Sequence, residues 1–144
     1  MKVSGFTIIR NAVLLDYPVV EAIRSILPLC DEVVVAVGKS EDNTRELVRS
    51  IDPKIRVIDT VWDDTQREGG RVLALETDKA FAGIADDADW CFYIQADEIL
   101  HESYLEVVSR AMKENMHDKQ VEGLLFKYRH FYGSFDYVAS SWNW

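Results

Sequence analysis

Hydrophobic residues along the first hundred positions follow two alternating spacings. Short, nearly continuous apolar runs, typical of buried strands, stand at residues 6–9, 32–37, 55–58 and 89–94. Between these runs, apolar residues recur every three or four positions, which is the spacing of one helix face. A strand followed by a helix, three times over and closed by a fourth strand, predicts an α/β fold. We expect a mostly parallel sheet with helices on both faces.

Prolines and polar turns set the expected ends of the helices. Pro18, after Asp16, indicates a helix start, and Pro28 ends that helix because a residue before proline disfavours α geometry. The second helix is broken at Pro53, and the polar residues 63–70 precede the third helix. The expected buried face of the third helix holds Leu73, Thr77, Ala80, Phe81 and Ile84.

The last forty residues predict a helix around residues 104–112 and a long strand around residues 122–132. Alternate residues of that strand would share one face, which either lines an acceptor groove, where sugars stack on flat rings, or is simply buried. They are Leu124, Phe126, Tyr128, His130 and Tyr132. Trp142 and Trp144 end the chain abruptly, so either the parent protein continues or these rings cap a surface.

The composition indicates a folded chain and narrows its partners. The 144 residues are 48% hydrophobic and 28% charged, which suits one domain with its own core. No apolar run approaches the roughly 20 residues that span a bilayer, and residues 1–6 are typical of a strand start rather than a signal peptide. A net charge of −9 without a basic run argues against a nucleic-acid partner.

The two cysteines, Cys30 and Cys91, stand far apart, each in an apolar context. A disulfide framework or a zinc site needs more ligands at closer spacing. We interpret both as reduced core residues of a cytoplasmic protein, with peripheral attachment at the inner membrane face left open.

Candidate chemistry collects where the predicted strands end. In open α/β sheets ligands bind beyond the carboxyl ends of the strands. Three segments reach that edge, namely Arg10 with Asn11, residues 38–40, and residues 95–98. The last of these segments carries two consecutive acids, Asp97 and Glu98. A divalent cation would relieve their repulsion, and Mg²⁺ or Mn²⁺ prefers one or two carboxylates plus phosphate oxygens. The alternative is that both acids cap the following helix.

Several of these segments together resemble family 2 glycosyltransferases. Residues 6–12 (Phe-Thr-Ile-Ile-Arg-Asn-Ala) are similar to the first strand and Asn-containing loop of that family. Residues 31–35 followed by residues 40–44 (Ser-Glu-Asp-Asn-Thr) resemble its second strand and helix start. Residues 93–98 (Tyr-Ile-Gln-Ala-Asp-Glu) stand where the family carries its DXD-type motif, and residues 130–134 are similar to a bacterial subgroup.

The resemblance implies a GT-A-like, Rossmann-type fold that binds a nucleotide-diphosphate sugar through Mg²⁺ or Mn²⁺. By position, Asp97 matches the metal-binding Asp, and Ala96 is the variable middle residue. Gln95 stands where many members have the first Asp and is a weaker ligand for a hard cation, although it could hydrogen-bond the ribose or a metal-bound water. Ile9, Arg10 and Asn11 fall on the donor-binding loop of the family. We interpret residues 1–144 as a single such domain, cut short at its C-terminal end.

Two further segments bear on donor binding. Many members read the base through an Asp after the second strand, where this chain has Val37 and Gly38. Gly38 would instead permit close approach of the backbone to the base, and Lys39 would reach a phosphate or remain a solvated surface residue. Arg71 follows the Gly69-Gly70 pair, which could expose N–H groups to an anion or form only a flexible loop.

Three hypotheses on function stay open at this point. The first is an inverting glycosyltransferase domain that transfers a sugar to an acceptor hydroxyl, carbohydrate or lipid-linked. The second is a donor-binding module without turnover, because no residue here matches the general base of the family; Asp136 is acidic and late, but its context differs. The third is an α/β interaction domain without a nucleotide. A receiver-type domain would need acids after the first strand, where Arg10 and Asn11 stand.

Overall fold

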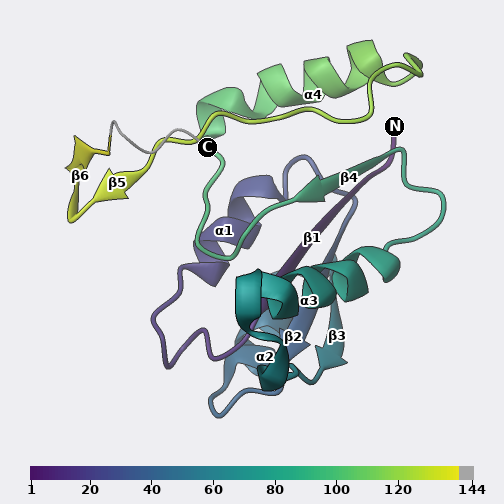
Figure 1. Ribbon diagram of the computed structural model, residues 1–144. Coiled ribbons are helices and arrows are strands. Elements are labelled where there is room, and N and C mark those ends of the chain that lie inside the picture. The colour runs from purple at the N-terminus through teal and green to yellow at the C-terminus, as the bar shows by residue number, and fades with distance from the viewer. Residues whose placement is uncertain (140–144) are drawn as a thin grey trace.

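The computed structural model describes residues 1–139 and contains a four-stranded, all-parallel sheet (Figure 1). The strands lie in the order β3-β2-β1-β4, and each neighbouring pair is parallel. Their bounds are β1 (Val3–Ile9), β2 (Glu32–Gly38), β3 (Ile55–Thr60) and β4 (Trp90–Tyr93). The predicted α/β architecture with a parallel sheet is therefore confirmed.

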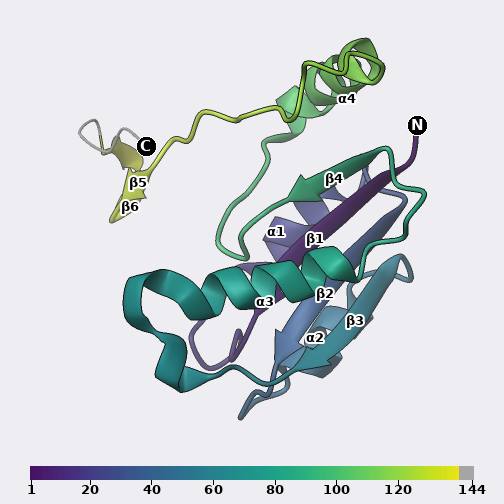
Figure 2. The same ribbon diagram turned by 45° about the vertical axis from the view of Figure 1, so that its right-hand side comes forward.

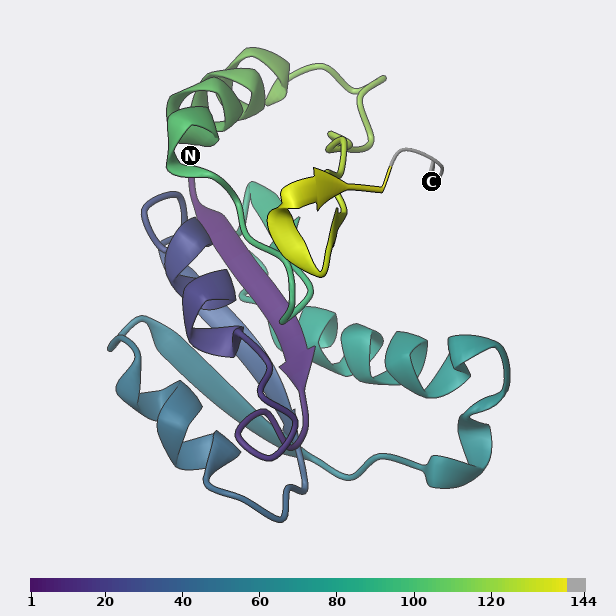
Figure 3. The ribbon, with the colours of Figure 1, turned by 90° about the vertical axis from the view of Figure 1, so that its left-hand side faces the viewer.

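Helices cover both faces of this sheet. The α-helices are α1 (Val19–Ile26), α2 (Thr44–Ser50), α3 (Arg71–Ala82) and α4 (Leu105–Asn115). Short 3₁₀ turns precede the last two of them, namely η1 (Asp64–Gln66), η2 (Glu68–Gly70) and η3 (Glu102–Tyr104). Helix α3 crosses one face of the sheet, and α1 and α2 lie against the other (Figures 2 and 3).

Strand β2 shows why its sequence is an unbroken apolar run. Val33 and Val35 point into the larger core beneath α1 and α2, whereas Val34 and Ala36 point into a smaller core beneath α3. All four side chains are completely buried. Double-sided burial removes any need for polar residues along the strand.

The strand order places a topological switch point between β1 and β4. The chain builds outward from β1 through β2 to β3, and then crosses back to pair β4 with the other edge of β1. The last β1–β4 pair joins Phe6 to Tyr93, and β1 continues three residues beyond it to Ile9. Residues 95–98 thus leave the sheet beside the carboxyl end of β1, the edge at which open α/β sheets bind ligands.

Helix α3 buries a different face from the predicted one. Val72, Glu76 and Ala80 face the sheet, while Leu73 and Phe81 are half exposed. Of the predicted set only Ala80 is fully buried. The pattern misled because a carboxylate occupies the buried stripe, where Glu76 accepts a hydrogen bond of 2.6 Å from Lys79 one turn later.

The long strand predicted over residues 122–132 is also wrong. Only Phe131–Tyr132 (β5) forms a strand, and it pairs with β6 (Ser134–Val138) in a small antiparallel hairpin apart from the main sheet (Figure 1). Within the described part of the chain, residues 121–129 pair with no strand, so their backbone forms no ladder, and the His130 carbonyl accepts from the Ala139 N–H at 2.8 Å beside the hairpin. The alternation still has a packing role, since Leu124 contacts the main core and the Phe126 ring lies 5.4 Å from that of Phe92.

The two cysteines differ in burial, contrary to the expectation that both lie in the core. Cys30 is buried, and burial raises the pKa of its thiol to about 12. Cys91 is exposed because β4 is the outer strand of the sheet and α3 does not extend over it. Both are free thiols, as expected.

The expectation about Trp142 and Trp144 concerns residues outside the described range. Over the described residues, none of the helices combines the length and apolarity needed to cross a membrane.

Truncation of one core residue tests this packing scheme. Ile23 of α1 is completely buried against the sheet, so Ile23→Ala should lower the free energy of unfolding by about 2–5 kcal/mol. Leu15, which is 57% exposed, supplies the matched control, and Leu15→Ala should change the value by less than about 0.5 kcal/mol. Urea unfolding followed by circular dichroism measures both, and equal losses would contradict the assigned core.

Candidate functional site

The acidic segment after β4 forms a tight turn at the switch point. The Glu98 N–H donates to the Gln95 carbonyl at 3.1 Å, and the Gln95 N–H donates to the Glu98 carboxylate at 2.9 Å. Ala96 is buried against the main core, which anchors the turn and leaves Asp97 exposed. Only the backbone of Ala96 could therefore contact a ligand.

The helix-capping interpretation of Asp97 and Glu98 does not hold. The next helical turn is η3, and its N-cap is His101, whose Nδ1 accepts from the Ser103 N–H at 3.2 Å. His101 thus lies at the entry of this helical turn. The Glu98 carboxylate closes the turn instead, so it is committed to the backbone.

Asp97 has the properties that a ligand of a hard divalent cation needs. Its carboxylate is exposed and has neither a hydrogen-bond donor nor an ion-pair partner among residues 1–139. Groups of three or more metal-ligating side chains are absent from the same residues. The residues therefore fit Mg²⁺ or Mn²⁺ held by one carboxylate together with phosphate oxygens and water, and they do not form a closed protein cage.

Tyr128 from the C-terminal segment reaches this acidic turn. Burial raises the pKa of its phenol, and the charge of Glu98 and a hydrogen bond to Glu98 raise it further. The rings of Tyr128 and His130 stack with their centroids 5.8 Å apart. Tyr128 and His130, two of the five residues predicted to share one face, thus lie together, and Tyr128 contacts the turn that carries Asp97.

The loop after β1 is fastened to the loop after β2 by polar side chains. The Ala12 N–H donates to the Thr44 hydroxyl at 2.7 Å, and the Leu14 N–H donates to the Asp42 carboxylate at 2.7 Å. Asn11 takes a left-handed backbone, with φ of 55°, which asparagine tolerates better than most residues. Its N–H donates to the Ser40 hydroxyl at 3.0 Å. The Ser-x-Asp-x-Thr segment therefore shapes the loop that carries Arg10 and Asn11.

Asp42 is held in its charged form by these contacts. Burial acts to raise the pKa of its carboxyl, but hydrogen bonds from Thr44 and from the Leu14 and Val13 N–H groups outweigh burial and lower the pKa below its ordinary value. Its other carboxylate oxygen accepts from the Thr44 N–H at 2.9 Å.

Gly38 has a packing role of its own at the end of β2. A Cβ atom at this position would clash with the indole of Trp62 and approach the Arg10 side chain to 3.1 Å. The Arg10 guanidinium in turn lies 5.8 Å from the centre of the Trp62 ring. Trp62 thus occupies the space beside Gly38 in which we expected the nucleotide base to approach the backbone. Ile9, the last residue of β1, is buried, so only its backbone could reach a ligand.

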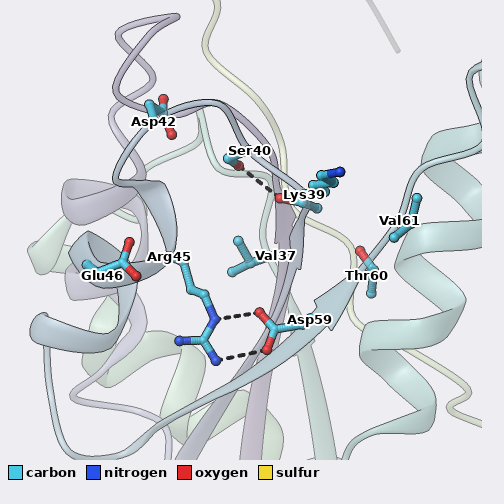
Figure 4. A pocket seen from close by; sticks show the side chains of 10 residues that line it. Val37, Lys39, Ser40, Asp42, Arg45, Glu46, Asp59, Thr60 and Val61 are labelled. Atoms are coloured by element: carbon cyan, nitrogen blue, oxygen red, sulfur yellow. Dashed lines mark hydrogen bonds and ion pairs between the residues drawn. The ribbon is translucent and has the colours of Figure 1, made fainter.

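An open hollow of about 400 Å³ lies at the carboxyl ends of β2 and β3 (Figure 4). Gly38 and Lys39 line it, as does the ion pair of Arg45 with Asp59, whose two bonds measure 2.6 and 2.8 Å. That pair lowers the pKa of Asp59 and raises the pKa of Arg45. Asp97 does not line the hollow, because β1 separates β2 from β4.

Arg71 opens helix α3 directly after two glycines with left-handed backbones, Gly69 at φ of 60° and Gly70 at 74°. Its side chain is exposed, and the structure does not bring it into contact with the other predicted site residues. Arg67, on the other side of the glycine pair, instead joins Arg10 at the Asp64 carboxylate, at 2.8 and 3.1 Å respectively.

Sequence reasoning missed three of these contacts. Asp59 is an acid near the carboxyl end of β3, and that position was the available signal for its pairing with Arg45. The bonds of Asp64 to Arg10 and of Glu98 to Tyr128 join residues far apart in sequence, and no local spacing reports them.

Comparison with known proteins supports the fold. No family model matches this chain. None of the curated proteins matches it. Among solved structures, S. aureus TarS residues 1–349 is similar, with a TM-score of 0.58 and 18% identity over 80% of this chain and 33% of that chain. A longer S. aureus TarS structure gives 0.53 and 17% over 80% of this chain and 20% of that chain.

Identity of 18% supports the fold alone, and this chain spans a third or less of each TarS chain. The chain therefore has a GT-A-like, Rossmann-type α/β fold.

Replacement of Thr44 tests the tie between the two loops. Thr44→Val keeps the shape but removes the acceptor of the buried Ala12 N–H, so the free energy of unfolding should fall by about 1–3 kcal/mol. Amide hydrogen exchange at Ala12 should also accelerate. The Thr65 hydroxyl donates to the Asp63 carboxylate in an exposed turn and its loss strands no buried N–H, so Thr65→Val should cost less than Thr44→Val. No difference between the two variants would contradict this role.

Acid should weaken the same tie. The pKa of Asp42 is lower in the folded chain than the value of about 3.9 in an unfolded one. The stabilisation is therefore complete above about pH 4 and is lost as the pH falls through the lowered pKa. Urea unfolding at several pH values should show wild type more stable than Asp42→Asn at pH 6, with the gap closing towards pH 2. A gap that does not change with pH would contradict the assignment.

Proposed function

We propose that this chain is the donor-binding part of an inverting glycosyltransferase of the family 2 type. In this proposal it binds a nucleotide-diphosphate sugar together with Mg²⁺ or Mn²⁺ and transfers the sugar to a hydroxyl of a carbohydrate or lipid-linked acceptor. A cytoplasmic location belongs to the same proposal. The GT-A-like fold supports the class of protein, and the site supports the chemistry.

One observation carries the proposal, namely the exposed carboxylate of Asp97 at the switch point between β1 and β4, which has no partner among residues 1–139. An acid held out by a rigid turn gains nothing from the core or from a helix dipole. The same position suits a cation that binds one protein carboxylate and the oxygens of a diphosphate.

Each residue of this edge has a distinct part in the proposal. A bound metal would offset the charge of the departing nucleoside diphosphate. Asp97 would hold that metal, and Gln95, which is exposed next to it, would hydrogen-bond the ribose or a metal-bound water. Arg10 and Lys39 would supply positive charge to phosphate oxygens. Asn11 shapes the loop after β1, on which Arg10 stands.

A second candidate function is donor binding without turnover. Its motivation is the lack of an assignable general base, because Asp136 lies in the β5–β6 hairpin, exposed and apart from the four-stranded sheet. Donor hydrolysis or sugar transfer by the 144-residue chain would exclude this candidate. The absence of both, with tight donor binding, would support it.

Asp97→Asn is the variant that tests the leading proposal. Calorimetry with UDP, GDP, CDP and dTDP should detect binding of one nucleotide to the wild type, and Mn²⁺ should strengthen it. Asp97→Asn should weaken the binding in Mn²⁺ by about 10- to 100-fold, since even residues that only support a metal ligand have effects of that size.

Asp86 gives a matched control, because it is an exposed acid in the connection before β4. It therefore lies toward the amino ends of the strands, away from the carboxyl ends where Asp97 stands. Asp86→Asn removes the same charge and should leave nucleotide affinity within about twofold of wild type. Nucleotide binding that ignores Mn²⁺, or equal losses in the two variants, would refute the assignment of Asp97.

A further inference from the structure

Two arginines from separate parts of the chain converge on one carboxylate oxygen. Arg10 Nη1 lies 3.1 Å and Arg67 Nη2 lies 2.8 Å from Oδ1 of Asp64. Arg10 follows β1, whereas Asp64 and Arg67 belong to the connection between β3 and α3. Two guanidinium groups thus share one carboxylate oxygen, on a chain whose net charge is −9.

The three charged side chains are held to different degrees. Arg10 is the best fixed, with 25% of its side chain exposed and its guanidinium against the Trp62 ring. Asp64 and Arg67 are 51% and 72% exposed. The Arg67 guanidinium is therefore the most accessible of the three charged groups, and the Asp64 carboxylate is half exposed to solvent and to a competing anion.

We infer that Arg10 and Arg67 form a seat for a phosphate or diphosphate group, and that the Asp64 carboxylate fills this seat until such an anion binds. A phosphate carries more charge and more acceptor oxygens than a carboxylate, so it matches two guanidinium groups better. An exposed ion pair shifts an equilibrium by only about two- to fivefold, so Asp64 leaves at little cost.

The backbone around Asp64 suits such an exchange. The connection ends at Gly69 and Gly70, which have left-handed backbones and open space where a Cβ would lie. Small rotations at these glycines would let the Asp64 segment shift while α3 and β3 stay in place. Asp64 is anchored through its two arginines and is otherwise exposed.

The position of the seat implies that Asp64 weakens binding of the donor diphosphate. This part of the inference rests on the proposed function. Arg10 lies over Trp62, which packs on the end of β2, so Asp64 draws the Arg10 guanidinium toward β2 and β3. Asp97 lies on the other side of β1, next to β4. A diphosphate bound through an Asp97-held metal competes with Asp64 for Arg10, and loss of the Asp64 charge strengthens its binding.

Titration with inorganic pyrophosphate in the absence of metal tests the seat directly. The indole N–H signal of Trp62, assigned by its loss in Trp62→Phe, reports occupancy beside Arg10 in two-dimensional NMR. Asp64→Asn should bind pyrophosphate about three- to tenfold more tightly than wild type, as expected for loss of two exposed ion pairs. Arg67→Gln in the Asp64→Asn background should abolish that gain.

Asp63→Asn is the matched control, because it removes the same charge one residue away. Asparagine is as good an N-cap as aspartate, so the turn at Thr65 survives. Its affinity for pyrophosphate should stay within about twofold of wild type. An equal gain in the two variants, or a gain that persists without Arg67, would overturn the seat.

Titration of the same variants with nucleoside diphosphate and Mn²⁺ separates this inference from the proposed function. A pyrophosphate gain in Asp64→Asn without metal-dependent nucleotide binding supports the seat and refutes the donor site. Nucleotide binding through Asp97 that is no tighter in Asp64→Asn refutes the competition between Asp64 and the donor diphosphate and leaves the donor site standing.

Discussion

Burial of β2 on both faces is the constraint on which the rest of the structure depends. Its valines and alanine fill the cores beneath α1, α2 and α3, so neither face of the central strands can carry a polar side chain without cost. Polar chemistry is therefore displaced to the carboxyl edge, where strands end and loops begin. The loops at this edge accordingly carry the polar side chains of the candidate site, namely Arg10, Lys39, Asp42 and Asp97.

The loops at this edge are ordered by hydrogen bonds to their own backbone rather than by apolar packing. Thr44 and Asp42 of the β2–α2 loop hold the N–H groups of the β1–α1 loop, and Glu98 holds the turn before it. Such bonds fix a backbone while leaving neighbouring side chains free. This arrangement explains how Asp97 and Lys39 can be exposed on loops that are nevertheless well defined.

The sequence predicted the order of strands and helices because short apolar runs alternate with segments of helical spacing, and prolines bound α1 and α2. It also predicted the place of Asp97 at the carboxyl ends of the strands. It failed for α3, where buried Glu76 disguises the packed face, and for residues 122–132, where alternation arises from packing without a strand partner. The Asp64 and Tyr128 contacts join distant segments, and one sequence holds no signal for them.

The outer edge of β4 has a practical consequence for handling the protein. Within the described residues this four-residue strand pairs only with β1, so its other side offers unpaired backbone groups. Cys91 is exposed on the same strand as a free thiol. Open strand edges invite edge-to-edge pairing between molecules, and a thiol there can make a chance encounter covalent. Purification of this chain is therefore best carried out at low concentration and under reducing conditions.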